Sequence, residues 1–357
     1  MATPPDAGLS RIGQIKGAAA TWGPGAAGLD ADRAMFLKLG AAEVLDAFER
    51  TCVFKGKTRE RNIRGGKSVA FPVFGKQGAR YHQPGTPILG EGNAPSDINE
   101  RIIELDALMI ADKAVYQVDE LMAYYDVRQN YTTELGRALA YEYDKRVARM
   151  VYAAAANSTE PLNKDGSASP KGPADNRGRI GAKLTLPAGY GSATTKQAKG
   201  DFLVDAIFDA RIALDKKDVP VEDMQAVCTP EAFYQITQSS RAINTDFNGG
   251  NGSNGTIARG STAQIAGIPL YASNHVKQPT YTLVAGDHNA DYAQNLSKCE
   301  ILVFSRDAVG VVSLLSPSLQ MTSGDWNIQF QATLMVARQA LGMGILRAES
   351  AVAIETA

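Results

Sequence analysis

The segment VDELMAYYDVRQNYTTELGRALAYEYDKRVARMVYAAAAN, residues 118–157, carries the strongest periodic signal in the sequence. Its apolar side chains recur at helical spacing, among them Leu121, Tyr125, Leu135, Leu139, Val147 and Val151. At 1.5 Å per residue, a helix of roughly 38 residues would extend about 57 Å, far beyond the mean helix of globular proteins. The pattern predicts either a long core or coiled-coil helix or the rigid spine of a flat, plate-like subunit.

Upstream of this helix, the stretch RNIRGGKSVAFPVFGKQGARYH, residues 61–82, contains a Gly-Lys-Ser sequence that raises the question of a nucleotide site. A phosphate-binding loop needs another glycine five positions before that glycine, so that backbone N–H groups can wrap the phosphates. Arg61 occupies this position. The stretch therefore does not match the motif, and a nucleotide-binding enzyme is a rival interpretation for a binding assay to test.

Residues 51–112 have the character of glycine-punctuated extended segments. Val69, Phe71 and Val73 alternate with small residues, and Ile103 and Leu105 continue the apolar pattern on the returning side. The pattern predicts a long two-stranded excursion. Because an isolated two-stranded ribbon is only marginally stable in water, we expect it to lie on another part of an assembly or on a neighbouring subunit.

This excursion concentrates basic side chains: Lys55, Lys57, Arg59, Arg61, Arg64, Lys67, Lys76 and Arg80. One interpretation is a nucleic-acid patch with aromatic stacking partners. The other is an interaction ribbon whose cations meet a neighbour's carboxylates, such as Glu91, Asp97, Glu100 and Glu104 of its returning strand. We favour the ribbon because the whole chain has a net charge of −1. It predicts intersubunit contacts through Arg59, Arg61, Arg64, Lys67, Phe71, Phe74 and Arg80.

The rest of the chain mixes helical and extended patterns. Residues 157–200 predict a basic loop without periodicity, either a solvated surface or a contact with a partner or nucleic acid. A second helix is expected over 201–219, and residues 224–239 predict a short buried strand, a Thr-Pro turn and a helix. Strands are expected within 263–276 and 299–323, and residues 326–355 form apolar, β-rich runs. The predicted fold class is α+β.

The residues that carry catalysis or bind metals form no recognisable constellation. Cys52, Cys228 and Cys299 are widely spaced and odd in number, which indicates a reducing compartment, and we expect all three to be buried. The three histidines, His82, His275 and His288, lack the spacing of a metal site. No nucleophile-elbow, zincin or dinucleotide-binding motif occurs. We therefore expect no enzyme activity, no cofactor and no metal.

The N-terminal 28 residues are rich in glycine, alanine and proline and predict a flexible arm. They lack the apolar stretch of a signal peptide, and nothing later reaches the ~20 apolar residues of a membrane span. We expect a soluble protein that is made in the cytoplasm and has no membrane partner.

Four blocks of the sequence, taken in order, resemble a known family: FLKLGAAEVLDAFERT (36–51), GKSVAFPVFGKQGARYHQPG (66–85), IELDALMIADKAVYQVDELMAYYDVRQNYTTELGRALA (103–140) and RQALGMGILRAESAVAIE (338–355). The chain resembles the major capsid proteins of tailed phages with the Hong Kong 97-type fold. Among these it is most similar to those of short-tailed, Autographivirus-like podoviruses.

The resemblance implies a division of the chain into parts. Residues 1–50 would be the N-terminal arm, and 51–112 the extended loop that laps a neighbouring subunit. Residues 113–200 would belong to the peripheral domain, with the spine helix at 118–157 and the basic loop at 157–200. Residues 200–310 would be mainly the axial domain, and 311–357 the strands that return to the peripheral domain.

The resemblance also implies a function. The chain would self-assemble as pentamers and hexamers into an icosahedral shell around the double-stranded DNA genome of a phage, and would reside in the virion after synthesis in the bacterial host. Its partners would be other copies of itself, a scaffolding protein, a portal protein and packaged DNA on the inner face. The shell is expected to be non-covalent. An encapsulin-like shell around an enzyme cargo is the alternative.

Overall fold

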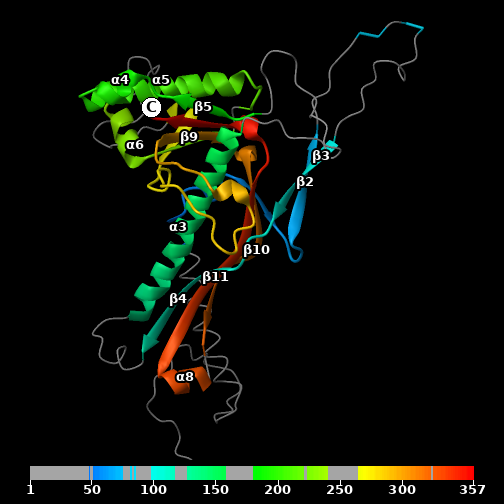
Figure 1. Ribbon diagram of the computed structural model, residues 1–357, viewed down its shortest axis with the longest axis vertical. Helices are drawn as coiled ribbons and strands as arrows, with labels where there is room; N and C mark the ends of the chain where they lie inside the picture. The colour runs from blue at the N-terminus through cyan, green and yellow to red at the C-terminus, as the bar shows by residue number, and fades with distance from the viewer. Residues whose placement is uncertain are drawn as a thin grey trace, which may run out of the picture. The chain divides into compact units, whose positions relative to one another are not determined.

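The computed structural model describes Phe48 and residues 51–74, 81–82, 84–85, 98–116, 127–157, 180–220, 223–239, 264–322 and 325–357. The chain divides into two compact units. Unit 1 comprises residues 1–52, 108–142 and 315–340, and unit 2 comprises 53–107, 143–314 and 341–357. Helix α3 (Val127–Ala156) and strands β10 (Val309–Met321) and β11 (Ala332–Ile345) contribute residues to both units (Figure 1).

A six-stranded mixed sheet forms the centre of unit 2, in the order β5-β12-β9-β6-β8-β7. Its central strands β9 (Cys299–Ser305) and β6 (Met224–Cys228) are buried along their whole length and pair antiparallel. Strand β12 (Ala351–Glu355) pairs antiparallel with β9 and parallel with β5 (Ala182–Thr185). At the other edge β8 (Ile268–Ala272) pairs parallel with β6, and β7 (Gln264–Ile265) pairs antiparallel with β8.

Helices α5 (Lys196–Asp215) and α6 (Pro230–Thr237) pack on this sheet, and the short helix α4 (Ala188–Ser192) precedes them (Figure 1). The buried residues of α5 include Leu203, Ile207, Ala210 and Leu214, so the spacing of three or four places them on one side of the helix. Thr229 caps α6 by accepting a hydrogen bond from the Ala232 N–H (3.2 Å), and Pro230 takes the first helical position. The predicted Thr-Pro turn is thus a helix start.

Three further strands lie near the beginning of unit 2. Strand β1 (Arg59–Asn62) pairs parallel with β10, from Arg59↔Gly310 to Asn62↔Ser313. Strands β2 (Ser68–Phe74) and β3 (Ile98–Glu104) form a separate antiparallel pair. The two-stranded excursion of the sequence therefore corresponds to β2 and β3, whereas β1 belongs to another sheet.

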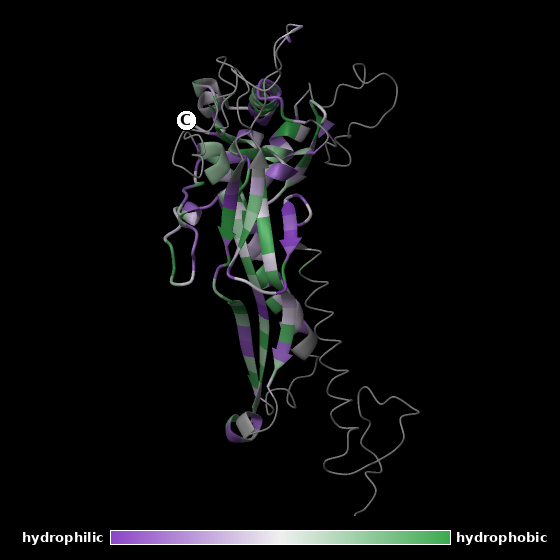
Figure 2. Cartoon of the chain, turned by 90° about the vertical axis from the view of Figure 1, so that its right-hand side faces the viewer, coloured by the Kyte–Doolittle hydropathy of each residue, from purple (hydrophilic) through white to green (hydrophobic). Residues whose placement is uncertain are grey.

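Unit 1 contains β4 (Met109–Tyr116), the helix α8 (Asp325–Phe330), the first part of α3 and parts of β10 and β11. Strand β4 pairs antiparallel with β11, from Met109↔Gln339 to Tyr116↔Ala332. In this unit the residues of β11 alternate between buried and half-buried, whereas its last residues, in unit 2, are almost all buried. Hydrophobic residues follow both long strands, β10 and β11, with hydrophilic ones between them (Figure 2).

The long helix differs from the sequence prediction mainly at its start. Helix α3 has 30 residues and ends at Ala156, and the expected residues 118–126 lie outside the described part of the chain. Side chains from Val147 to Ala155 are buried all around the helix, where Asn289 lies against Met150 and Gly181 approaches the backbone of Ala154 and Ala155. The run AAAA at 153–156 supplies the small side chains that such close enclosure needs.

Regular structure also occurs where the sequence predicted a loop through residue 200. Residues 158–179 lie outside the described part, but β5, α4 and the start of α5 all fall between 182 and 200. Strand β5 is short and finds its partner in β12, 170 residues later, with Ala182 opposite Val352. No local pattern can reveal a strand whose pairing is that distant.

The three cysteines are free thiols. Cys228 and Cys299 are buried as expected, and burial raises the pKa of the Cys228 thiol to about 12. Cys52 is only half-buried, which corrects the expectation that all three are enclosed.

Candidate subunit-contact surface

The antiparallel pair β2–β3 is seated on its own chain through one face. Because successive side chains of a strand point to opposite faces, every second residue turns inward. The inward residues Val69, Phe71 and Ile103 form an apolar cluster with Val312 of β10 and with Leu346, which follows β11. The pair is therefore held by hydrophobic burial within unit 2.

Glycines on β11 make room for the end of this pair. A Cβ atom on Gly342 would lie 2.1 Å from the carbonyl oxygen of Glu104, and one on Gly344 would lie 2.7 Å from Cγ1 of Ile103. The backbone of β3 thus passes so close to β11 that only a residue without a side chain fits at position 342.

The opposite face of the pair is exposed and acidic. The register places Glu104 opposite Ser68, Ile102 opposite Ala70 and Glu100 opposite Pro72. Ile102 is 59% exposed, and a carboxylate stands on either side of it along β3. This face combines an apolar centre with two negative charges, a composition suited to a partner surface that carries basic groups.

The predicted basic residues lie beside this pair, not on its exposed face. All four residues of β1 are exposed, and so are Arg64 and Lys67 in the connection to β2. Arg59 forms an exposed ion pair with Asp307 of the same chain (3.2 Å). The guanidinium of Arg61 lies 5.8 Å from the centre of the Phe71 ring.

The predicted aromatic contacts have different outcomes. Phe71 is buried in the apolar cluster of its own chain, so it supports the ribbon from within and does not offer a surface. Phe74 is the last residue of β2 and pairs with Ile98 through its backbone. Its side chain lies outside the part of the chain that the structure describes. Arg80 also lies outside the described residues. The structure thus brings Arg61 and Phe71 together and leaves Arg64 and Lys67 exposed beside them.

One member of the basic cluster, Lys57, is not a surface cation. Its Nζ atom lies 2.9 Å from the centre of the Tyr271 ring, and burial lowers the pKa of Lys57 to about 8 against the attraction of Asp144. Asp144 accepts hydrogen bonds from the N–H groups of Val53 (2.8 Å) and Phe54 (3.2 Å). These contacts fasten the start of the extended region to α3.

The buried carboxyl of Asp144 predicts a pH-dependent stability. Burial raises the pKa of Asp144 to about 6, although the hydrogen bonds and Lys57 oppose the shift. A folded-state pKa above that of the unfolded chain means that this group's contribution is present below pH ~4 and is lost as the pH rises to ~6. We expect the free energy of unfolding of the wild type, relative to an Asp144→Asn variant, to fall by about 3 kcal/mol across that interval.

Urea denaturation followed by circular dichroism at pH 4, 5, 6 and 7 measures this difference. Lys57 titrates near pH 8 and above, so it does not contribute in the same interval. If the difference in the free energy of unfolding between the wild type and Asp144→Asn stays constant from pH 4 to 7, the prediction is wrong.

A second buried network joins the segment before β4, helix α3 and the loop after β8. Arg146 pairs with Asp106 (3.2 Å) and with Asp287 (2.9 Å), and all three side chains are nearly inaccessible to solvent. The Tyr292 hydroxyl donates to Asp106 (2.7 Å), and so does the backbone N–H of His288 (3.1 Å). Two carboxylates from distant parts of the chain thereby share the one cation that α3 supplies.

The two carboxylates of this network have opposite pKa shifts. Burial raises the pKa of Asp106, and the bonds from Tyr292 and His288 and the charge of Arg146 only partly offset it. Burial acts in the same direction on Asp287, but hydrogen bonds from Val284 and Tyr281, with Arg146, lower its pKa overall. Asp287 is thus the carboxylate held firmly in the charged form.

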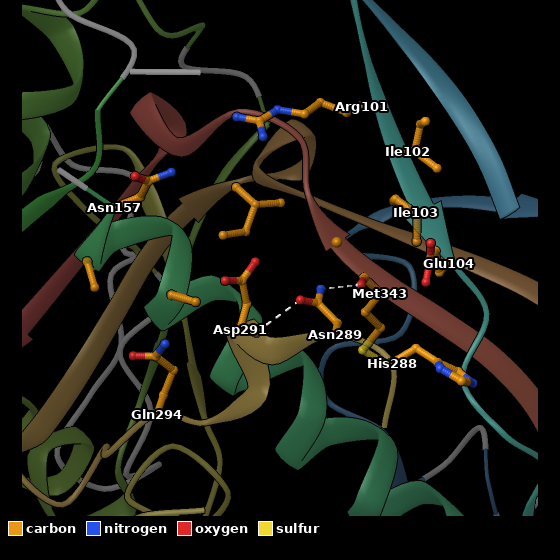
Figure 3. A pocket seen from close by; sticks show the side chains of 14 residues that line it. Arg101, Ile102, Ile103, Glu104, Asn157, His288, Asn289, Asp291, Gln294 and Met343 are labelled. Carbon is orange, nitrogen blue, oxygen red and sulfur yellow. Dashed lines mark hydrogen bonds between the residues drawn. The ribbon is translucent and has the colours of Figure 1, made fainter. Parts of the chain in front are cut away.

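A cavity of about 880 Å³ lies in unit 2 between β3, the end of α3 and the loop after β8 (Figure 3). Arg101, Asn157, Asp291 and Gln294 surround it, and Asn289 is fixed there by donating to the Met343 carbonyl (2.9 Å) and accepting from the Asp291 N–H (2.9 Å). Its lining offers both charges and several amides, but it pairs no nucleophile with a base. Across the described residues no three His, Cys, Asp or Glu side chains gather to hold a metal ion.

Sequence reasoning found the basic residues but missed Asp106, Asp144, Arg146 and Asp287. None of them belongs to a recognisable motif, and only the fold brings Asp106 and Asp287 to Arg146. The available signal was weak: Arg146 and Arg149 fall on the otherwise apolar, last part of the long helix, where a charge requires a buried partner.

Comparison with protein families gives a match to the model of Gp10A-like major capsid proteins over residues 70–355. The major capsid protein of Escherichia phage T7 is 29% identical over 341 residues, which cover 90% of this chain and 91% of the phage protein.

Solved structures show the same likeness. The capsid of the cyanophage P-SCSP1u has a TM-score of 0.71 and 30% identity, covering 86% of this chain and 88% of the other. The mature capsid of bacteriophage PhiM1 has a TM-score of 0.65 at 13% identity, covering 85% of this chain and 87% of the other, which shows the fold alone.

Proposed function

This chain belongs to the family of Gp10A-like major capsid proteins, and we propose that it assembles as pentamers and hexamers into the icosahedral shell that encloses the double-stranded DNA of a short-tailed phage. The fold is that of Hong Kong 97-type phage capsids. The observation that carries the proposal is the match of 86% of the chain to the cyanophage capsid at 30% identity. The encapsulin-like alternative is not favoured, because the relatives near this identity are phage capsid proteins.

The proposal includes finer points that the family membership supports. A scaffolding protein, a portal protein and packaged DNA would be the partners, and the virion would be the protein's location after synthesis in the host. Residues 1–50 would act as the arm, 51–112 as the lapping loop, 113–200 and 311–357 as the peripheral domain, and 200–310 as the axial domain. Among the described helices none is long and apolar enough to cross a membrane.

Expression in bacteria with and without a scaffolding protein, followed by electron microscopy, tests the proposal. Closed shells or ring-shaped capsomers are the expected products. Particles that hold a specific enzyme would support the encapsulin alternative, and a failure to form any shell or capsomer would overturn the proposal.

We further propose that the contact between subunits is electrostatic and heterologous, so that two different surfaces of the chain meet. The exposed basic residues Arg61, Arg64 and Lys67 of one subunit would face Glu100 and Glu104 on the β2–β3 pair of the next. Arg59, Phe74 and Arg80 would extend this contact, and Phe71 would support it from beneath.

Charge reversal tests this contact. We expect the double variant Arg61→Glu, Arg64→Glu to form shells about tenfold less efficiently or worse, because like charges would then meet across each contact. Adding Glu100→Lys and Glu104→Lys to the same chain should restore assembly. Light scattering and sedimentation of assembled particles measure the yield.

The control is the double variant Lys216→Glu, Lys298→Glu, which makes the same change of charge at exposed positions of unit 2 outside this contact. It should assemble normally. If the reversed chain assembles like the wild type, or if high salt leaves the assembly yield unchanged, the contact is not electrostatic.

A further inference from the structure

The loop between β8 and β9 carries an exposed apolar turn, residues 282–285 with the sequence TLVA. Leu283 is 41% exposed and Val284 is 55% exposed. The loop stands out from the surrounding structure of unit 2, with hydrophobic colouring along part of it (Figure 2). Two neighbouring aliphatic side chains in solvent on one turn are unfavourable for an isolated protein, because neither is removed from water.

Backbone hydrogen bonds and a cation fix the ends of this turn. The backbone N–H of Tyr281 donates to the Gln294 carbonyl (3.2 Å). The Arg149 guanidinium lies 3.8 Å from the centre of the Tyr281 ring. On the other side, the Ala107 N–H donates to the Gly286 carbonyl (3.0 Å). Gly286 has a φ of +114°, a backbone conformation that residues with a side chain rarely adopt. A Cβ atom at this position would lie 2.9 Å from the Cβ atom of Ala107.

Asp287 closes the turn from within. Its carboxylate accepts from the Tyr281 hydroxyl (2.8 Å) and the Val284 N–H (3.1 Å), while the Asp287 N–H donates to the Val284 carbonyl (3.0 Å). Arg146 of helix α3 binds the same carboxylate (2.9 Å). A buried ion pair thus holds the two exposed aliphatic side chains in one conformation.

We propose that this turn, with Leu283 and Val284 at its tip, is a preformed contact that inserts into a second copy of this chain when subunits assemble. The inference rests on the proposed function and adds a contact to it. A rigid turn loses little conformational entropy on binding, so the burial of its aliphatic side chains is retained as affinity. This role gives a reason for burying an ion pair beneath a solvent-exposed turn, although the burial of charges costs desolvation free energy.

The chemistry of the turn favours another protein subunit over nucleic acid. Residues 279–286, PTYTLVAG, contain no charged side chain, whereas DNA binding depends on cations that neutralise phosphates. An uncharged aliphatic tip needs an apolar recess on its partner. In a shell, each subunit is surrounded by further copies of itself, so a second copy is the partner that is always present.

Chemical labelling tests the contact directly. In the variant Leu283→Cys, the new thiol should react with a maleimide in free subunits and at least about tenfold more slowly in empty, DNA-free shells. The wild type supplies the background, since Cys228 and Cys299 are buried and Cys52 is half-buried. Equal labelling in subunits and shells would overturn the inference.

Assembly of a second variant gives an independent measurement. Leu283→Ser combined with Val284→Ser should reduce the shell yield about tenfold while the thermal unfolding of free subunits stays unchanged, because neither side chain takes part in the network beneath. The control is Thr280→Ala with Thr282→Ala, exposed polar positions that flank the tip. Normal assembly of the serine variant would contradict the proposal. Failure of the wild type itself to form shells would instead overturn the proposed function, and this contact with it.

Discussion

Replacing Gly342 with alanine is expected to abolish assembly by destabilising the subunit. The new Cβ would lie 2.1 Å from the Glu104 carbonyl oxygen and 2.9 Å from the Leu105 Cα, which are backbone atoms of the last residue of β3 and of the residue after it. Backbone cannot rotate away as a side chain can, so β3 or β11 must move. Overpacking of this kind costs about 3 kcal/mol or more, a large share of the stability of a typical domain.

Two other glycines give a graded control. A Cβ on Gly344 would meet the side chain of Ile103 at 2.7 Å, and that side chain can adjust. Gly191 in α4 has no atom within 4 Å of such a Cβ. We expect the unfolding midpoints in urea to rank Gly191→Ala above Gly344→Ala and both above Gly342→Ala. A Gly342→Ala protein as stable as Gly191→Ala would show that β3 does not pass β11 this closely.

The largest effect of a side-chain deletion is expected for Arg146→Ala. Arg146 is shared by Asp106 and Asp287, and its removal leaves two buried carboxylates without their cation. Loss of one partner from a buried ion pair costs about 3–5 kcal/mol, because the remaining charge is uncompensated. The thermal unfolding temperature of the free subunit should fall accordingly, and assembly should fail with it.

Arg137→Ala is the matched control on the same helix. Arg137 also forms an ion pair, with Glu134 at 2.6 Å, but both side chains are exposed. Exposed pairs contribute at most about 1 kcal/mol. If the two variants lose the same free energy of unfolding, the network around Arg146 contributes no more to stability than an exposed ion pair does.

Local patterns in the sequence predicted the elements whose residues are close together in the chain. The apolar spacing of residues 127–156 specifies a helix wherever it is placed, and the alternation of Val69 and Phe71 specifies a strand. The mostly apolar run of β6 and the Thr-Pro start of α6 were likewise local signals. Together with the four ordered blocks that resemble phage capsid proteins, they sufficed for the family and the fold.

The sequence by itself therefore determined the helices α3, α5 and α6, most strands, the family and the presence of a basic region before β2, but not α4, which lies in a predicted loop, or α8, which starts a run predicted as β-rich. Only the tertiary structure decided which charges are exposed: it placed the half-buried Lys57 against the Tyr271 ring, paired Arg59 with Asp307, turned Phe71 inward and left Glu100 and Glu104 on the open face. It also joined Asp106, Arg146 and Asp287 beneath the turn at Leu283. The physical reason is that burial and charge pairing depend on residues that meet across 40 to 248 positions of the chain, a separation that no local pattern records.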